Sequence, residues 1–362
     1  MRIILTGGGT AGHITPNIAL IPELKRAGFE IHYIGTKEGM ERQLIGPLGI
    51  PYHTVHAGKL RRYLNLKNLT DLFQIARGFA ESLAIVAKIK PNVVFSKGGF
   101  VSSPVVWASW FHRIPVVIHE SDITPGLANK LSIPFASKIC YTFPETKKYL
   151  PLAKGVLTGL PVRESLFGGD AAKAKRICGF NDNKPVIMII GGSQGSEILN
   201  KAIRSVLGQI TEKFDLCHIC GENGTDSSLN QIRGYKQFDY VNEELPHLMA
   251  MADLVISRAG ATTLFELLAL KKPNLLIPLS KQASRGDQIL NAYSFEKQGF
   301  SKALAEENLN PESLLTQVNS VYDSRDEYIA AMNASQINNG IQSVLTTIEM
   351  LAKSKNKINH SK

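Results

Sequence analysis

The chain contains 362 residues, about twice the length of a typical domain, so its length predicts two domains of similar size. Hydrophobic residues make up 44% of the chain and charged residues 20%, which excludes an intrinsically disordered protein. The net charge is +10. Residues 1–165 contain 20 Lys and Arg and 10 Asp and Glu, whereas the remaining residues contain 21 basic and 21 acidic side chains, so the whole excess lies in the first half. This asymmetry predicts an anionic partner for the first half: nucleic acid, a membrane surface or a phosphorylated substrate. A generic solvated surface is the alternative.

The first 160 residues alternate short apolar runs with helical patterns. Strands are predicted at 2–6, 30–35, 93–96, 116–119 and 139–141, and helices at 17–25, 68–89 and 103–111. Such alternation is typical of a parallel sheet covered by helices on both faces.

A second α/β pattern begins after the proline- and glycine-rich stretch at 159–169. Its predicted strands are at 185–190, 216–220, 254–257 and 274–277. We therefore predict two Rossmann-like domains at 1–160 and 161–339, followed by a helix and basic tail at 340–362 that packs back on the first domain. Because parallel sheets bind ligands at the carboxyl ends of their strands, we expect the two sites to face each other across a cleft.

A glycine-rich loop follows the first predicted strand. Gly7, Gly9 and Gly12 satisfy the spacing of a dinucleotide fingerprint, but the second strand ends without the acid that would hold a ribose. An adenosine dinucleotide is therefore disfavoured, although the loop can still bind phosphate. His13 follows the last glycine and could remove a proton, since histidine titrates near neutrality; a purely structural histidine is the alternative.

The second domain carries three loops suited to a nucleotide sugar. Gly191–Ser196 can donate hydrogen bonds to a diphosphate, Glu266 can accept hydrogen bonds from ribose hydroxyls, and Ser284–Gln288 offers polar groups to a sugar. Each loop taken alone could be an ordinary turn or helix cap. Their combination favours a donor-binding site.

Neither a metal site nor export is expected. Cys217 and Cys220 lie in a predicted strand, where residues three apart point to opposite faces, so they cannot close a zinc site with His218. With Cys140 and Cys178 they make four scattered cysteines, which we expect to be reduced. We see no signal peptide, and no apolar run approaches the roughly 20 residues that cross a bilayer.

Five motifs in order give the chain a specific resemblance over essentially its full length. They are Gly7–His13, Lys97–Val101, His119-Glu120 with Pro125–Asn129, Gly191–Gly195, and Arg258–Thr263 with Asp287-Gln288. The chain resembles the MurG family, peripheral bacterial transferases that add N-acetylglucosamine to undecaprenyl-pyrophosphoryl-muramyl pentapeptide during peptidoglycan assembly. The resemblance implies the glycosyltransferase B architecture, inverting transfer from UDP-N-acetylglucosamine to the muramyl 4-hydroxyl, and no metal or other cofactor.

The resemblance also implies which residues form the site. We favour His13 as the general base, with Glu120 as the runner-up and His119 as a positioning residue. Candidate substrate-binding residues are Thr10, Ala11 and Gly12 near the sugar and diphosphate, Asp122 and Asn129 beside them, Arg163 on the donor, Ser193 and Gln194 on the phosphate, Val241 with Ala261, Thr262, Thr263, Leu264, Phe265 and Glu266 on the uridine, and Gln288 on the sugar hydroxyls.

Two positions depart from the family pattern. Ala11 stands where a glycine is common, which affects the closest backbone approach. Ser121-Asp122 stands where Gln-Asn is usual, so a carboxylate replaces an amide beside a diphosphate. The second departure puts the role of Asp122 in question.

An anionic lipid acceptor fits the basic first half. Residues 59–67 mix Lys and Arg with Leu and Tyr, as a segment in contact with headgroups would, although a solvated basic loop is the alternative. We therefore expect a peripheral protein on the cytoplasmic face of the cell membrane and no nucleic-acid partner. Other possible functions are a UDP-N-acetylglucosamine 2-epimerase, a related glycolipid synthase and a non-enzymatic nucleotide-sugar-binding regulator.

Overall fold

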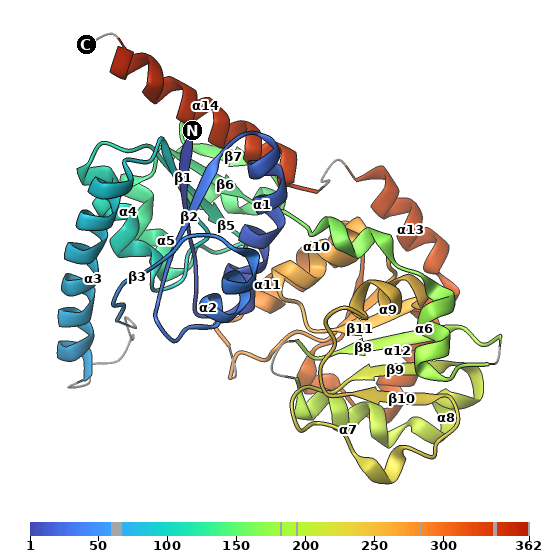
Figure 1. Ribbon diagram of the computed structural model, residues 1–362. Helices are drawn as coiled ribbons and strands as arrows, with labels where there is room; N and C mark the ends of the chain where they lie inside the picture. The colour runs from blue at the N-terminus through green and yellow to red at the C-terminus, as the bar shows by residue number, and fades with distance from the viewer. Residues whose placement is uncertain (59–66, 182, 193–194, 283, 336–338, 361–362) are drawn as a thin grey trace. The chain divides into compact units, whose positions relative to one another are not determined.

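The structure, a computed structural model, describes residues 1–58, 67–181, 183–192, 195–282, 284–335 and 339–360. The chain forms two compact units, Met1–Arg163 with Asn339–Lys362, and Glu164–Asn338. We refer to them as the first and second domains (Figure 1).

The described part of the first domain contains a seven-stranded parallel sheet in the order β3-β2-β1-β4-β5-β6-β7. Its strands are β1 (Arg2–Thr6), β2 (Glu30–Gly35), β3 (Tyr52–Thr54), β4 (Val93–Ser96), β5 (Val116–Glu120), β6 (Lys138–Tyr141) and β7 (Gly155–Leu157). Its helices are α1 (Thr15–Arg26), α2 (Met40–Ile45), α3 (Lys67–Ile89), α4 (Ser102–Phe111), α5 (Leu127–Ser132) and α14 (Ile341–His360). The order 3-2-1-4-5 is that of a Rossmann fold.

Apolar side chains cover both faces of this sheet. On one face Ile3 and Leu5 of β1 pack with residues of α1 and α14, including Ile348. On the other face Ile4 packs with residues of α3 and α4, including Val105. Figure 1 shows α14 lying along the first domain although it ends the chain. A central strand buried on both faces must be apolar at every position, which is why these strands are readable as short apolar runs.

The chain returns to the first domain through hydrogen bonds made by the Asn339 side chain and the Gly340 backbone. Asn339 accepts a hydrogen bond from Val162 N (3.0 Å) and donates one to Val162 O (3.0 Å). Gly340 N then donates to Leu160 O (2.9 Å). The segment leaving the domain and the segment re-entering it are thus held together, and this fixes where α14 begins.

The described part of the second domain contains a six-stranded parallel sheet in the order β10-β9-β8-β11-β12-β13. Its strands are β8 (Val186–Ile190), β9 (Asp215–Ile219), β10 (Tyr235–Phe238), β11 (Leu254–Ser257), β12 (Asn274–Leu276) and β13 (Lys302–Ala303). Its helices are α6 (Ala171–Cys178), α7 (Glu197–Ser205), α8 (Leu207–Lys213), α9 (Leu245–Met251), α10 (Ala261–Ala269), α11 (Asp287–Lys297), α12 (Pro311–Asp323) and α13 (Arg325–Ala334). The prediction of two Rossmann-like α/β domains is confirmed.

Candidate active site

The glycine-rich loop of the first domain follows β1 and is shaped by close packing. Gly9 has φ +92°, and a Cβ placed there would lie 2.7 Å from the ring of Phe100. Gly99, at φ +84°, approaches so closely that an added Cβ would lie 2.1 Å from Gly8 O. A side chain at Gly9 or Gly99 would separate the loop after β1 from the loop after β4. The glycines therefore bring two strand ends together.

Three side chains hold this loop from within the domain. The Tyr33 hydroxyl donates to Gly7 O (2.6 Å), and Asn17 Nδ2 donates to Tyr33 Oη (3.2 Å). The Glu41 carboxylate, which is fully buried, accepts from Gly9 N (3.3 Å) and from Thr36 N (2.9 Å). A backbone donor of the fingerprint loop is thus already bound to a carboxylate of the protein itself.

Thr10 to His13 lie at the accessible end of the loop. Thr10 is exposed, while Ala11, Gly12 and His13 form a short 3-10 turn that is half-buried. His13 N donates to Thr10 O (3.1 Å), and α1 begins two residues later. The backbone of this turn is therefore fixed at the carboxyl edge of the sheet, next to the exposed Thr10.

Glu120 ends β5 and organises the turn that follows it. Its Oε1 accepts from Asp122 N (3.0 Å), and its Oε2 accepts from Gly126 N (2.9 Å) and Asn129 Nδ2 (2.8 Å). Burial raises the pKa of the Glu120 carboxyl, and the neighbouring Asp122 raises it further. Both oxygens are thus engaged in tying the strand end to the first turns of α5.

His119 is a buried, neutral residue. Its Nε2 donates to Gly159 O (3.0 Å), and its ring lies 6.3 Å from that of Phe95. Burial lowers the pKa of His119 well below its ordinary value, and the nearby Lys97 lowers it further. The His119 side chain therefore links β5 to the segment after β7. Because it has no exposed surface, it cannot contact a substrate itself.

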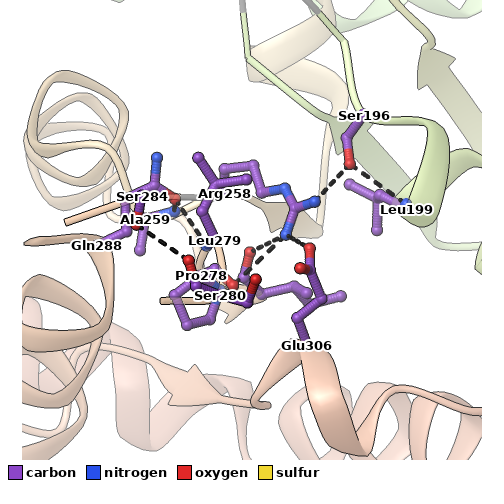
Figure 2. Close-up of polar contacts among 11 residues, drawn as sticks. Ser196, Leu199, Arg258, Ala259, Pro278, Leu279, Ser280, Ser284, Gln288 and Glu306 are labelled. Atoms are coloured by element: carbon purple, nitrogen blue, oxygen red, sulfur yellow. Dashed lines mark hydrogen bonds and ion pairs between the residues drawn. The ribbon is translucent and has the colours of Figure 1, made fainter. Parts of the chain in front are cut away.

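In the second domain, Arg258 connects the loops at the strand ends (Figure 2). Its guanidinium donates to Ser196 Oγ (2.6 Å) and Ile277 O (3.1 Å) and forms an ion pair with Glu306 (2.5 Å). Ser196 in turn caps α7 by accepting from Leu199 N (3.3 Å). Both charged side chains are 8% exposed, so Arg258 is an internal brace: its hydrogen bonds join the loop after β11 to those after β8 and β12, and its ion pair joins it to the segment after β13.

Gln288 forms a second connection between the same loops. Its Oε1 accepts from Ala259 N (3.2 Å) and Leu279 N (3.1 Å), so the carbonyl end of the amide is held by backbone groups (Figure 2). Nearby, Asn291 Nδ2 donates to Ala259 O (3.3 Å). The loop preceding α10 is therefore fixed by α11.

The remaining predicted donor residues occupy different surroundings. Thr262 and Thr263 are half-buried on the first turn of α10, whereas Ala261, Leu264 and Glu266 are buried. The Phe265 ring packs in the core, 5.4 Å from that of Phe295, so this residue could reach a ligand only through its backbone. Val241 is buried between β10 and α9, and Arg163 ends the first domain. Ser193 and Gln194 lie outside the described residues, as do residues 59–66 of the predicted membrane segment.

The geometry thus places two groups of predicted residues at two sheet edges, one in each domain. The first group is Thr10, Ala11, Gly12, His13, Glu120, Asp122 and Asn129, and the second is Ala261–Glu266 with Gln288. Within the described ranges, no cluster of three or more His, Cys, Asp or Glu residues could hold a metal ion. None of the helices described is both long and apolar enough to cross a membrane.

Residues 3–141 match the glycosyltransferase family 28 N-terminal domain, and residues 186–348 match the corresponding C-terminal domain. The UDP-N-acetylglucosamine--N-acetylmuramyl-(pentapeptide) pyrophosphoryl-undecaprenol N-acetylglucosamine transferase of Clostridium tetani is 56% identical over 98% of this chain and 99% of its own length. The enzyme of the same name from Clostridium novyi is 55% identical over 97% of this chain and 99% of its own. The chain belongs to the MurG family of family 28 glycosyltransferases.

Solved structures show the same fold. Acinetobacter baumannii MurG superposes with a TM-score of 0.75 at 24% identity, covering 96% of this chain and 99% of that one. A UDP-GlcNAc 2-epimerase from Neisseria meningitidis, bound to UDP-GlcNAc, superposes with a TM-score of 0.68 at 13% identity, covering 97% and 100%. Fold alone therefore does not separate a MurG enzyme from an epimerase, and the separation comes from sequence.

Several residues that shape this MurG site were not predicted from the sequence. Glu41, Lys97 and Glu306 are charged residues, which are exposed in most proteins, and here all three side chains are buried at strand ends. The motifs containing Lys97 and Arg258 were recognised, but the buried contacts of these two side chains were not. The sequence signal that could have identified these charged residues is their position. Glu41, Lys97 and Arg258 each follow a predicted strand within a few residues, in or just after a turn that contains glycine.

Proposed function

We propose that this enzyme transfers N-acetylglucosamine from UDP-N-acetylglucosamine to the 4-hydroxyl of undecaprenyl-pyrophosphoryl-N-acetylmuramyl pentapeptide, with inversion at the anomeric carbon. The observation that carries the proposal is 56% identity along 98% of the chain to a transferase of that name. The bond between the anomeric carbon and UDP breaks, a bond to the acceptor oxygen forms, and UDP leaves with the electron pair. The proton of the acceptor hydroxyl passes to a general base.

His13 is our candidate for that base. It lies half-buried at the accessible end of the glycine loop, next to Thr10 and Gly12, which we assign to the donor sugar and diphosphate. Glu120 is less suited to accept the proton, because three hydrogen bonds already engage its two oxygens. We assign Glu120 and Asn129 to holding the turn that carries Asp122 beside the substrates.

The second domain supplies the donor groups. Gly260 has no side chain to cover the first turn of α10, so the helix N-terminus can receive the negative charge of the diphosphate. Glu266, Val241 and the backbone around Thr263 are assigned to the uridine, Ser193 and Gln194 to the phosphates, Arg163 to the donor and Gln288 to the sugar. Because the carbonyl of Gln288 is held by Ala259 and Leu279, its amide nitrogen is the group we assign to the sugar hydroxyls.

The test is transfer of labelled N-acetylglucosamine from UDP to the muramyl lipid, in the presence of a chelator. We expect a labelled lipid product and stoichiometric UDP, in amounts that chelation does not change. An epimerase would release UDP or form the 2-epimer without the lipid, and a glycolipid synthase would label diacylglycerol instead. Either result would replace the proposal with that alternative.

We further propose that the first domain binds an anionic membrane surface from the cytoplasmic side. The predicted segment 59–67 leads into α3, whose early turns expose Leu72 (60%) and Phe73 (68%). Exposed apolar side chains next to a basic segment suit contact with headgroups and acyl chains. A Leu72→Ser/Phe73→Ser variant should sediment less with anionic liposomes than the native protein, whereas Phe167→Ser, an exposed control in the second domain, should not. Equal sedimentation of all three proteins would rule out this surface.

A further inference from the structure

Lys97 is a lysine buried at the end of β4, with 1% of its surface exposed. Its backbone N donates to Thr6 O (2.9 Å), and a Cβ added at Gly7 would lie 3.1 Å from Lys97 Cβ. The next two residues, Gly98 and Gly99, turn away with positive φ. The side chain therefore runs under the glycine loop and into the domain, where an ammonium group needs partners.

Those partners come from the turn after β5. Lys97 Nζ donates to Ser121 Oγ, and the carboxylates of Glu120 and Asp122 act on it electrostatically. Burial lowers the pKa of Lys97 to about 8, and the two carboxylates oppose that change. Lys97 thus binds the serine that stands between the two acids in the sequence, and both acids favour its charged form.

This arrangement explains how an aspartate is tolerated at position 122. Burial and the neighbouring Asp122 both raise the pKa of Glu120, whereas Lys97 supplies a positive charge that lowers it. Like charges in such a site force one acid to take up a proton or to move away. Because Glu120 anchors the turn through Gly126 and Asn129, either change would distort the loop.

We propose that Lys97 is a positioning residue that holds the Glu120–Gly126 turn in its active geometry by binding Ser121 and balancing the charge of Asp122. Lys97 does not meet substrate itself, since its side chain is closed off by the glycine loop. Lys97 and Asp122 should therefore behave as a matched pair: the carboxylate is useful only while the ammonium is present. The inference rests on the proposed transferase activity, which supplies its readout.

A double-mutant cycle tests the pairing. Kcat and KM for both substrates are measured for the native enzyme, Lys97→Met, Asp122→Asn and the double variant. We expect each single change to lower kcat/KM by about tenfold or more, and the double variant to be more active than Lys97→Met alone. Asp122→Asn should thus reduce activity in the native background and raise it in the Lys97→Met background. A residue that only contacts substrate would reduce activity in both.

The control is Lys154→Met. Lys154 is a half-buried lysine of the same domain whose Nζ donates only to the carbonyls of Ile133 and Pro134 in the described structure, so this variant should retain native kcat/KM.

Native activity in Lys97→Met, or a double variant no more active than Lys97→Met, would overturn the inference. If Lys97→Met does not fold, recovery of folding and activity by the added Asp122→Asn supports the pairing. If the double variant does not fold either, removal of the Asp122 charge has not compensated for the loss of Lys97, and the pairing is overturned. Absence of transfer by the native enzyme would instead refute the proposed function.

Discussion

At the scale of single residues, the histidines of this enzyme divide by burial. His119 and His218 are both buried: His119 donates from Nε2 to Gly159 O, and His218 binds Tyr235 and Asn200 through its two ring nitrogens. Burial lowers the pKa of both, so both are neutral at physiological pH. His13 differs, because its half-buried position at the glycine loop leaves it within reach of a substrate. Its place on the glycine loop distinguishes the candidate base, since other histidines such as His112 and His247 are also half-buried.

Replacing His13 by alanine should lower kcat at saturating substrates by about 10²- to 10⁴-fold, the usual contribution of a general base. KM for UDP-N-acetylglucosamine should change much less, because the proton is removed only during the chemical step. His247→Ala is the control, since its ring accepts a hydrogen bond from Asp170 N in the second domain and is assigned no part in catalysis. Near-native turnover of the His13 variant would assign the base to another group.

His218 should make the second domain less stable as the pH falls. Its Nδ1 accepts from the Tyr235 hydroxyl (2.8 Å), its Nε2 donates to Asn200 Oδ1 (3.0 Å), and burial lowers its pKa to about 3. Below a pH of about 6.5 the unfolded chain takes up a proton that the folded chain refuses, so stability declines by up to about 1.4 kcal/mol per pH unit. From pH 7 to pH 5 the native protein should therefore lose about 2 kcal/mol more than His218→Gln, measured by urea unfolding. Equal losses in the two proteins would contradict this linkage.

At the scale of elements, the sequence predicted the strands and loops whose signals lie in consecutive residues. It missed the features that depend on packing between residues far apart in the chain. The strands at 93–96 and 254–257 were predicted because apolar residues fill every position except the final serine, as is typical of a central parallel strand. The short edge strands β3, β7, β10 and β13 were missed, since two to four residues carry little periodic signal. The loops of the candidate site were located by their glycines. The side chains that brace them, such as Glu306, were not, because their partners lie far away in sequence.

The Arg258 brace gives a test at this scale. Glu306→Gln would leave the Arg258 guanidinium without a counter-charge in a site that is 8% exposed, which should cost about 2 kcal/mol or more. Because Arg258 also binds Ser196 at the start of α7, KM for UDP-N-acetylglucosamine should rise while KM for the lipid acceptor stays near native. Glu307→Gln, an exposed neighbour, is the matched control in thermal unfolding and kinetics. A stability loss without any change in donor KM would limit the brace to a structural role.

At the scale of the whole molecule, the first domain is built from both ends of the chain. The chain leaves the first domain after Arg163, builds the second domain and then re-enters the first, where Asn339 pairs with Val162. Helix α14 fills the β1 face of the first sheet with Val344, Leu345, Ile348 and Ala352. The first domain therefore cannot complete its core until the end of the chain has been made.

This dependence predicts that a single substitution near the C-terminus weakens the N-terminal domain. Ile348 is fully buried against the β1 face, so Ile348→Ala should destabilise the first domain by about 2–5 kcal/mol through lost contacts and an unfilled cavity. Met350→Ala on the same helix changes a side chain that is 52% exposed, so it should cost no more than about 0.5 kcal/mol. Hydrogen exchange resolved along the chain is the appropriate measurement, because it assigns the loss to a domain.

Amides of β1 and β4 should exchange faster in Ile348→Ala, whereas those of β8 and β11 should keep native protection, since Ile348 belongs to the core cluster of the first domain. UDP binding should be retained for the same reason, because most of the proposed donor residues lie in the second domain. Faster exchange throughout both domains would mean that they unfold as one unit. Unchanged exchange in β1 would mean that α14 contributes little to the first core.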